Sequence, residues 1–284
     1  MRGLISVFTR LSGAIIRAFM VVILVVMPAL LLPRDAQDNL QIVVLFAIFA
    51  AIFTIAEYSS ASPSIIEFRE APPFNRVRFT TLFATVLCLS MVFRGYVSPS
   101  GITELFQQAG AGIGAAADFP YSPVRLMVLM LPQDTSAQMV ARVRDGAGLS
   151  YMISAFAIIW FVIVLRLQQW PRREGPFNVW VNLPTFNSAG GDVVERLERD
   201  GRINVILGFL LPFLVPAVLK LFASFGTPVR LDDMHTLLWM VAAWAFLPAS
   251  ILMRGVALSR VAQMIRMQRN AASQRTASSG HYMG

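Results

Sequence analysis

The sequence predicts an all-α fold: a polytopic integral membrane helical bundle with about six transmembrane helices and cytoplasmic N and C termini. Hydrophobic residues make up 56% of the chain and charged residues only 14%, against about 25% charged residues in soluble domains. Several uncharged apolar stretches approach the ~20 residues that cross ~30 Å of hydrocarbon. The basic residues flank these stretches, and their distribution indicates the orientation.

Six apolar stretches have the hydropathy of membrane-spanning helices. They are Ala14–Leu32, Leu40–Ala56, Phe79–Phe93, Leu149–Leu165, Ile203–Phe225 and Leu237–Met253. We expect the first to be retained, because it is longer than the core of a signal peptide and lacks a small-residue cleavage pattern. Residues 1–253 are therefore predicted to form one transmembrane domain.

The basic residues between the spans predict the orientation. The N-terminal segment, the loops 57–78 and 166–202, and the tail hold three, three, six and five arginines. The segments on the other side hold one, four and one. Basic residues resist translocation, so the first set is predicted to be cytoplasmic and the segment 94–148 periplasmic. We expect a bacterial inner (plasma) membrane, because 23 arginines against one lysine are typical of a high-GC genome.

The periplasmic segment leaves open whether residues 102–131 are re-entrant, interfacial or periplasmic. Apolar residues from Ile102 to Ile113 have the spacing of one helix face, and the following apolar run is too short to cross a membrane. Gly110 and Gly114 have the spacing of a close helix contact, although we favour a flexible small-residue stretch. A separate helix is predicted from Asp134 or Ser136 through Arg144, ending at Gly146 and Gly148.

The two cytoplasmic loops contain similar fragments, EAPPFN at 70–75 and EGPFN at 174–178. One interpretation is a surface that docks a partner. Its candidate residues are Phe74, Asn75, Phe177, Asn178 and Trp180. The alternative, which we favour, is that Pro-Phe turns suit a chain re-entering the membrane interface, where aromatic rings settle. Residues 177–183 alternate as in an extended strand, and Asp192 is predicted to begin a helix.

The tail 254–284 is basic. Its first part, to about Asn270, is predicted to continue the sixth helix, and its end is predicted to be disordered. Its candidate contacts with lipid headgroups are Arg254, Arg260, Arg266 and Arg269.

Residues that carry chemistry are scarce. Arg17, Glu57 and Lys220 lie near predicted span ends, where long side chains reach the interface, and no buried carboxylate is evident. Two histidines and one cysteine predict neither a metal site nor a cofactor. The chain also lacks nucleophile-elbow, phosphate-loop and zinc-protease motifs. We therefore expect no enzymatic activity, and the missing carboxylate disfavours ion-coupled transport.

The fifth span contains Gly208, Pro212 and Pro216 at four-residue spacing, a candidate helix kink or hinge. Each proline frees a backbone carbonyl, which could line a solute path. A simple kink in a membrane helix is the interpretation that we favour.

These observations predict a non-enzymatic multi-pass protein that serves as an accessory subunit, scaffold or assembly factor of a membrane complex. Its expected partners are the lipid bilayer and other membrane-protein subunits. Nucleic acid is not expected, because the basic residues flank apolar segments and do not form one polar face. The alternative is a permease-like transporter that moves a neutral or anionic small solute past the fifth span.

Overall fold

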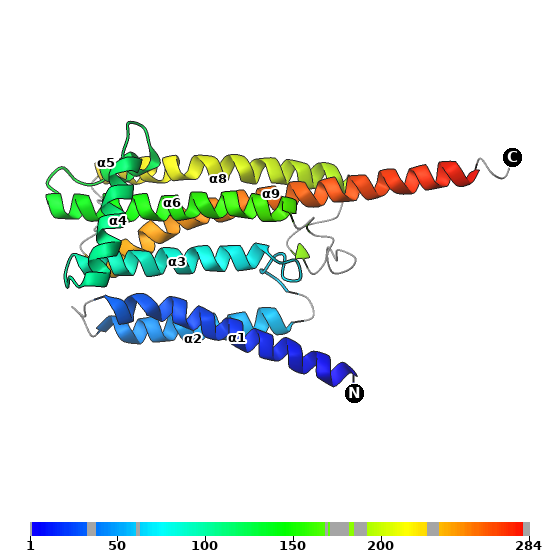
Figure 1. Cartoon of the computed structure of the whole chain (residues 1–284), viewed down its shortest axis with the longest axis horizontal. Coiled ribbons are helices and arrows are strands. Elements are labelled where there is room, and N and C mark those ends of the chain that lie inside the picture. The colour runs from blue at the N-terminus through cyan, green and yellow to red at the C-terminus, as the bar shows by residue number, and fades with distance from the viewer. Residues whose placement is uncertain are drawn as a thin grey trace.

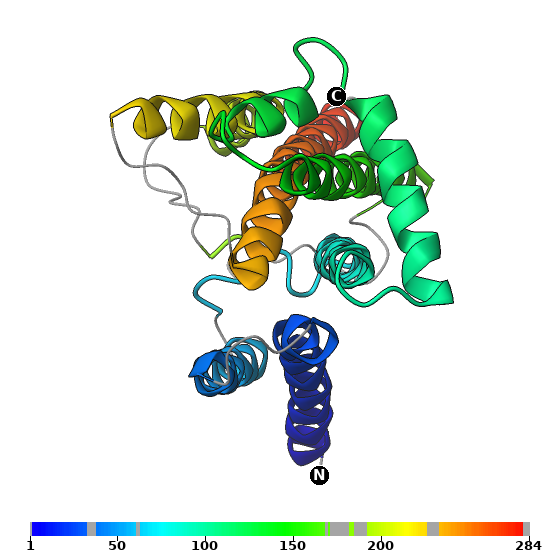
Figure 2. The same cartoon turned by 90° about the vertical axis from the view of Figure 1, so that its left-hand side faces the viewer.

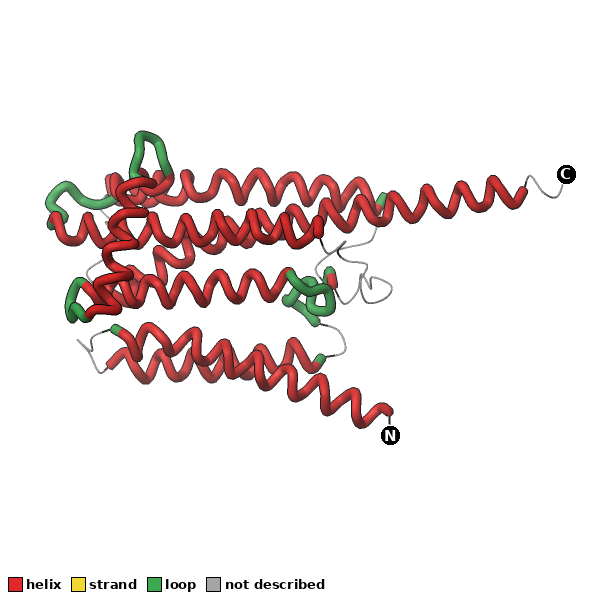
Figure 3. The backbone as a smooth tube through the Cα atoms, viewed as in Figure 1, coloured by secondary structure: helices red, strands yellow, loops and turns green. Residues whose placement is uncertain are grey.

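The computed structural model is a bundle of α-helices. It describes residues 2–32, 38–60, 63–167, 170, 182–184, 192–225 and 233–280. The helices are α1 (Arg2–Leu31), α2 (Asp38–Ser59), α3 (Phe74–Gly95), α4 (Gly101–Ala117), α5 (Pro123–Leu129), α6 (Ala137–Leu167), α8 (Val193–Ser224) and α9 (Met234–Gly280). The described residues contain no strand (Figure 3), which confirms the all-α prediction. Most of the run 177–183, predicted to be extended, lies outside them.

Six helices are long and apolar enough to cross a membrane. The spans are Leu11–Leu31, Leu40–Ser59, Phe74–Gly95, Ala137–Leu167, Val193–Ser224 and Met234–Gln274. The predicted number is therefore confirmed, although most of the helices extend beyond the predicted bounds. Figure 1 places both termini at one end of the bundle. We call that end the termini side and the other end the opposite side.

Helix α9 lies at the centre of the bundle. It packs against α3, α6 and α8 (Figures 1 and 2). Its first half contributes Leu237, Val241 and Ala245 to an apolar cluster shared with α1, α3, α5 and α6. Farther along, Met253 and Leu258 join a second cluster shared with α6, α8 and the loop before α3. One helix therefore holds together the two halves of the core.

Helix α9 also continues far beyond the bundle on the termini side (Figure 1). It runs without interruption from Met234 to Gly280, so the predicted continuation of the sixth span into the tail is confirmed. The helix passes Asn270, after which disorder was expected, and proline occurs within it at Pro248 but not in the projecting part.

Helices α1 and α2 form a hairpin that is attached to the bundle mainly by packing of α1 on α3. Leu24 and Met27 of α1 join the core on that face, and Arg94 of α3 donates to the Leu31 carbonyl at 3.0 Å. Helix α2 turns large apolar side chains such as Phe46 and Phe49 outward. In a membrane this outer face contacts lipid chains, which are as apolar as the side chains themselves.

Helices α8 and α9 approach each other almost to backbone contact. A Cβ atom on Gly208 would lie 2.7 Å from the Leu252 backbone nitrogen and from the Pro248 carbonyl oxygen. A Cβ atom on Gly255 would lie 2.6 Å from the Gly201 carbonyl oxygen. Gly208, predicted as part of a kink or hinge, is therefore the point at which the two helices touch.

Helix α4 runs across the opposite-side ends of α3 and α6 instead of alongside them (Figures 1 and 2). A Cβ atom on Gly148 of α6 would lie 2.5 Å from the Gly114 Cα atom of α4. The expected flexible stretch is therefore wrong, because Gly110 and Gly114 lie in a helix that needs small residues for its contact with α6. The expected helix end at Gly146 and Gly148 is also wrong, because α6 continues through both residues.

Substituting Gly148→Ala should lower stability, because the new methyl group meets the backbone of α4. We expect a loss of about 1–3 kcal/mol, the usual cost of overpacking, measured as the free energy of unfolding in mild detergent. Gly112→Ala on α4 is the matched control, since nothing lies within 4 Å of its Cβ position. That variant should be unchanged or slightly more stable. Equal effects at both positions would contradict the contact.

Candidate functional site

Three buried carboxylates lie within the described residues, contrary to the expectation that none is present. Asp145 is 1% exposed, Glu57 6% and Glu67 8%. Asp145 was missed because Gly146 and Gly148 were taken as a helix end. The absence of proline from Ala137 to Leu167 was the signal for one continuous helix. Glu67 was missed because its partner lies 187 residues away in sequence.

Glu67 is the centre of a polar junction on the termini side. Arg254 of α9 donates through Nε to Glu67 Oε2 at 2.6 Å and through Nη2 to Oε1 at 2.8 Å. Its third nitrogen, Nη1, donates to Asn204 Oδ1 on α8 at 3.1 Å. This two-pronged geometry is the strongest arrangement available to an arginine and a carboxylate. Glu67, Asn204 and Arg254, which we call the polar junction, link the loop before α3 to α8 and α9.

Hydrogen bonds to and from the backbone attach the two loops of the termini side to each other. Phe68 N donates to the Asn182 carbonyl at 2.7 Å, and Glu70 N donates to Asn182 Oδ1 at 3.1 Å. Trp170 Nε1 donates to the Ala71 carbonyl at 3.2 Å. Phe68 has a φ of 53°, a left-handed conformation that is uncommon for a bulky residue. The structure therefore brings together the loops in which similar fragments were noted.

An aromatic cluster lies beneath this loop contact. The ring of Phe68 is 4.7 Å from that of Phe74 and 5.5 Å from that of Trp170, and Phe74 is 5.8 Å from Phe161 of α6. Phe74 is 1% exposed. It therefore anchors the loop inside the protein and does not form part of a partner surface.

The other residues of the predicted partner surface are placed only in part. Asn75 is half-buried and donates through Nδ2 to the Glu67 carbonyl at 2.7 Å. Its amide therefore supports the polar junction. Phe177, Asn178 and Trp180 lie outside the described residues.

Glu57 closes the loop after α2. Its carboxylate accepts the backbone N–H groups of Ser64, Ile65 and Ile66 at 3.0–3.2 Å. Arg69 donates to the carbonyls of Glu57 and Ser60 at 2.9 and 2.6 Å. Glu57 thus satisfies donors within the protein and does not extend toward solvent, as was expected for a residue at the end of a span.

The four tail arginines predicted to contact lipid headgroups have partners within the chain. Arg254 belongs to the polar junction, and Arg260 donates through Nε to the Trp170 carbonyl at 3.3 Å. Arg266 pairs with Glu198 at 2.7 Å, and Arg269 pairs at the same distance with Asp192. These contacts align the projecting part of α9 with the start of α8.

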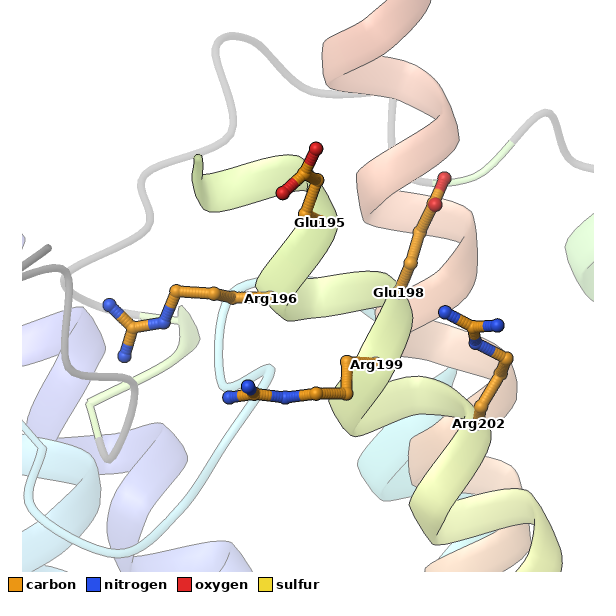
Figure 4. Close-up of a pocket in the computed structure, with 5 residues that line it drawn as sticks. All are labelled: Glu195, Arg196, Glu198, Arg199 and Arg202. Atoms are coloured by element: carbon orange, nitrogen blue, oxygen red, sulfur yellow. The ribbon is translucent and has the colours of Figure 1, made fainter. Parts of the chain in front are cut away.

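The start of α8 carries a charged surface hollow of about 420 Å³ (Figure 4). It is lined by Glu195, Arg196, Glu198, Arg199 and Arg202. Asp192 caps the helix as predicted, by accepting the Val194 N–H at 3.2 Å. The hydrogen bond from Arg269 holds the pKa of Asp192 below its ordinary value. Opposite charges alternate along the hollow, which is typical of a solvated helix surface.

A second buried charge lies on the opposite side. Tyr96 donates its hydroxyl to Asp145 Oδ2 at 2.7 Å, and Arg144 Nε donates to Oδ1 at 3.0 Å. The guanidinium of Arg142 lies 5.2 Å from the centre of the Tyr96 ring. Burial, followed by the hydrogen bond to Asp145, raises the pKa of Tyr96 to about 12. The carboxylate is thus paired where α4 crosses α3 and α6.

The prolines of α8 free a carbonyl that another helix uses. Pro216 has no N–H to donate to the carbonyl of Pro212. Trp244 Nε1 of α9 donates to that carbonyl at 3.0 Å, and Pro212 and Pro216 are both buried. The Pro212 oxygen therefore takes part in helix packing and is not free to bind a solute.

Two further polar residues near the opposite side serve helix ends. Lys220 donates to the Leu129 carbonyl at the end of α5, although it was expected to reach the interface. Asp233 begins α9, since its carboxylate accepts the Thr236 N–H at 2.7 Å. Burial favours the protonated form of Asp233, but the hydrogen bonds from Thr236 outweigh it and lower the pKa below its ordinary value.

Within the described part of the chain, no three His, Cys, Asp or Glu side chains lie close enough together to hold a metal ion. The six spanning helices and the polar contacts at both ends define a multi-pass integral membrane protein. No family of known proteins matches the chain, and no characterised protein or solved structure matches it either.

Replacing Glu67 by glutamine should leave the Arg254 guanidinium without its anion. We expect the free energy of unfolding in mild detergent to fall by about 1–3 kcal/mol, the cost of an unsatisfied buried group. Glu70→Gln is the control, because its side chain is half exposed and lies 3.5 Å from Arg69. That change should cost less than about 0.5 kcal/mol.

The double variant Glu67→Gln/Arg254→Gln tests whether this loss comes from the pair itself. It should lose less stability than the sum of its single variants, by about 0.5–3 kcal/mol. Strictly additive losses would show that Glu67 and Arg254 act independently.

Tyr96 should titrate above the ordinary range of a tyrosine. Its pKa is raised from the ordinary value of 10.0 to about 12, so its stabilising contribution is complete below pH ~10 and is lost as the pH rises through about 12. A tyrosinate absorbance titration should contain a step near that pH that is absent from Tyr96→Phe. Tyr121→Phe, at a residue that is 88% exposed, is the control and should leave that step in place. A step near pH 12 whose amplitude is unchanged in Tyr96→Phe would refute the assignment.

Proposed function

We propose that the chain is a non-enzymatic protein of a bacterial inner membrane, in which it serves as a scaffold, accessory subunit or assembly factor of a membrane complex. The partner-binding element is the projecting part of α9 on the cytoplasmic side.

The length of α9 is the observation that carries this proposal. Its 47 residues extend about 70 Å, more than twice the ~30 Å of hydrocarbon. The ion pair of Arg269 with Asp192 marks the point where α8 begins, and α9 continues from there to Gly280. A helix held beyond the bundle gives a membrane-anchored protein a rigid surface for a neighbouring subunit.

The buried charges also favour a structural role. An ion-coupled carrier needs a carboxylate that can lose and regain its counterion. Glu67 is paired with Arg254, and Asp145 is paired with Arg144 and also accepts the Tyr96 hydroxyl. The permease-like alternative has less support, because the Pro212 carbonyl is bonded to Trp244.

The arginine distribution supports the proposed cytoplasmic placement. The segments on the termini side hold seventeen basic residues and those on the opposite side hold six. An even number of spans returns the chain to the side on which it started. The excess of basic residues on the termini side therefore supports a cytoplasmic position for both termini.

Truncation after Asn270 should remove partner binding without unfolding the bundle. We expect the full chain to cross-link and co-purify with a defined membrane-protein partner in mild detergent, and the truncated chain to lose that partner. Thermal unfolding should be unchanged, because the described core contacts of α9 end before Asn270. Truncation after Gly280 is the control and should keep the partner. A full chain that always runs alone under cross-linking would refute the scaffold function.

A further inference from the structure

Two arginines lie on the termini side where the α1–α2 hairpin meets the bundle, and neither forms an ion pair within the described part of the chain. Arg17 of α1 donates to the Gly13 carbonyl of its own helix at 2.7 Å, and its guanidinium lies 4.7 Å from the centre of the Tyr58 ring. Arg78 of α3 lies 5.0 Å from the centre of the Phe74 ring. Its Nε atom is buried without a hydrogen-bond partner.

Tyr58, near the end of α2, connects these two arginines. It interacts electrostatically with Arg17, Arg78 and Arg69. Arg69 already binds the carbonyls of Glu57 and Ser60. The three residues Arg17, Tyr58 and Arg78, which we call the hairpin seam, thus come from three different helices. Its two arginines carry positive charges that no ion pair within the described residues balances.

The neighbouring carboxylates balance this charge only in part. Glu67 attracts Arg78 electrostatically, but both of its oxygens accept hydrogen bonds from Arg254. Glu57 accepts the backbone N–H groups of residues 64–66. A buried guanidinium nitrogen without an acceptor is costly, so an external anion would stabilise the seam.

We propose that the hairpin seam binds the phosphate of an anionic phospholipid from the leaflet on the termini side. Arg17 is exposed, Tyr58 is the last but one residue of α2, and Arg78 lies in the second turn of α3. Tyr58 and Arg78 therefore lie close to helix ends, and Arg17, in the middle of α1, lies level with Tyr58 because its guanidinium is 4.7 Å from that ring. We infer that all three lie at headgroup depth. The planar fork of arginine matches phosphate geometry, and an anionic leaflet attracts basic residues near its surface.

This assignment differs from the one that the sequence predicts. Arg254, Arg266 and Arg269 were expected to contact headgroups, but each has a carboxylate of its own. The lipid site requires no protein partner, so it can be tested independently of the scaffold function.

Native mass spectrometry of the full chain in mild detergent tests the site, with phosphatidylglycerol and phosphatidylcholine as probes. We expect preferential retention of phosphatidylglycerol, together with a rise in the unfolding temperature. Arg17→Gln and Arg78→Gln should each weaken phosphatidylglycerol binding about fivefold. Arg78→Lys, which keeps the charge but loses the fork, should recover part of the binding.

The double variant Arg266→Gln/Arg269→Gln is the matched control, because it removes two arginines on the same side that already have acidic partners. It should leave phosphatidylglycerol binding unchanged. Arg17 is exposed, so Arg17→Gln should fold even if Arg78→Gln does not. Unchanged binding in Arg17→Gln, or an equal loss in the control, would overturn the site. Equal stabilisation by inorganic phosphate would show that the seam takes a soluble anion and not a lipid.

Discussion

The hydrocarbon core of a membrane offers no water, so each polar group within it needs a partner from the protein itself. This constraint bears most directly on the buried polar groups described here. The carbonyl freed by Pro216 accepts the Trp244 indole, and the buried Asp145 carboxylate accepts Tyr96 and Arg144. Trp244 comes from α9 and Tyr96 from the end of α3, so satisfying these polar groups also fixes how neighbouring helices lie. Apolar packing alone would specify this weakly, because side chains and lipid are equally apolar.

Small residues at helix contacts act together with these polar contacts to hold the helices against each other. Where α8 meets α9 and where α4 meets α6, glycine removes the side chain that would hold the backbones apart. Close approach increases van der Waals contact, which must replace the hydrophobic effect between helices in lipid. The two glycine contacts lie in different halves of the bundle, and each lies beside a charged residue. Arg254 precedes Gly255, and a Cβ atom on Gly114 would lie 2.8 Å from the Asp145 Cα atom.

The spans could be predicted from the sequence because crossing a bilayer requires a long apolar stretch, and the number of spans is correct. The site could not be predicted to the same extent. Phe74 was placed on a surface because a loop position is normally exposed, whereas the loop folds back over α6. The pair of Glu67 with Arg254 depends on a contact between distant segments, which no local pattern contains. The burial of Asp145 could have been predicted, because its helix contains no proline that would end it.

The central position of α9 has a consequence for how the protein is made. A chain enters the membrane from its N terminus during synthesis, and α9 follows all the other described helices. The five earlier spans must therefore reside in the bilayer before the helix that joins both halves of their core is present. During that interval Glu67 has no Arg254 and the Pro212 carbonyl has no Trp244. Arrival of the last helix is then the step that closes the bundle, and a chain interrupted before it would leave Glu67 without its arginine at the membrane.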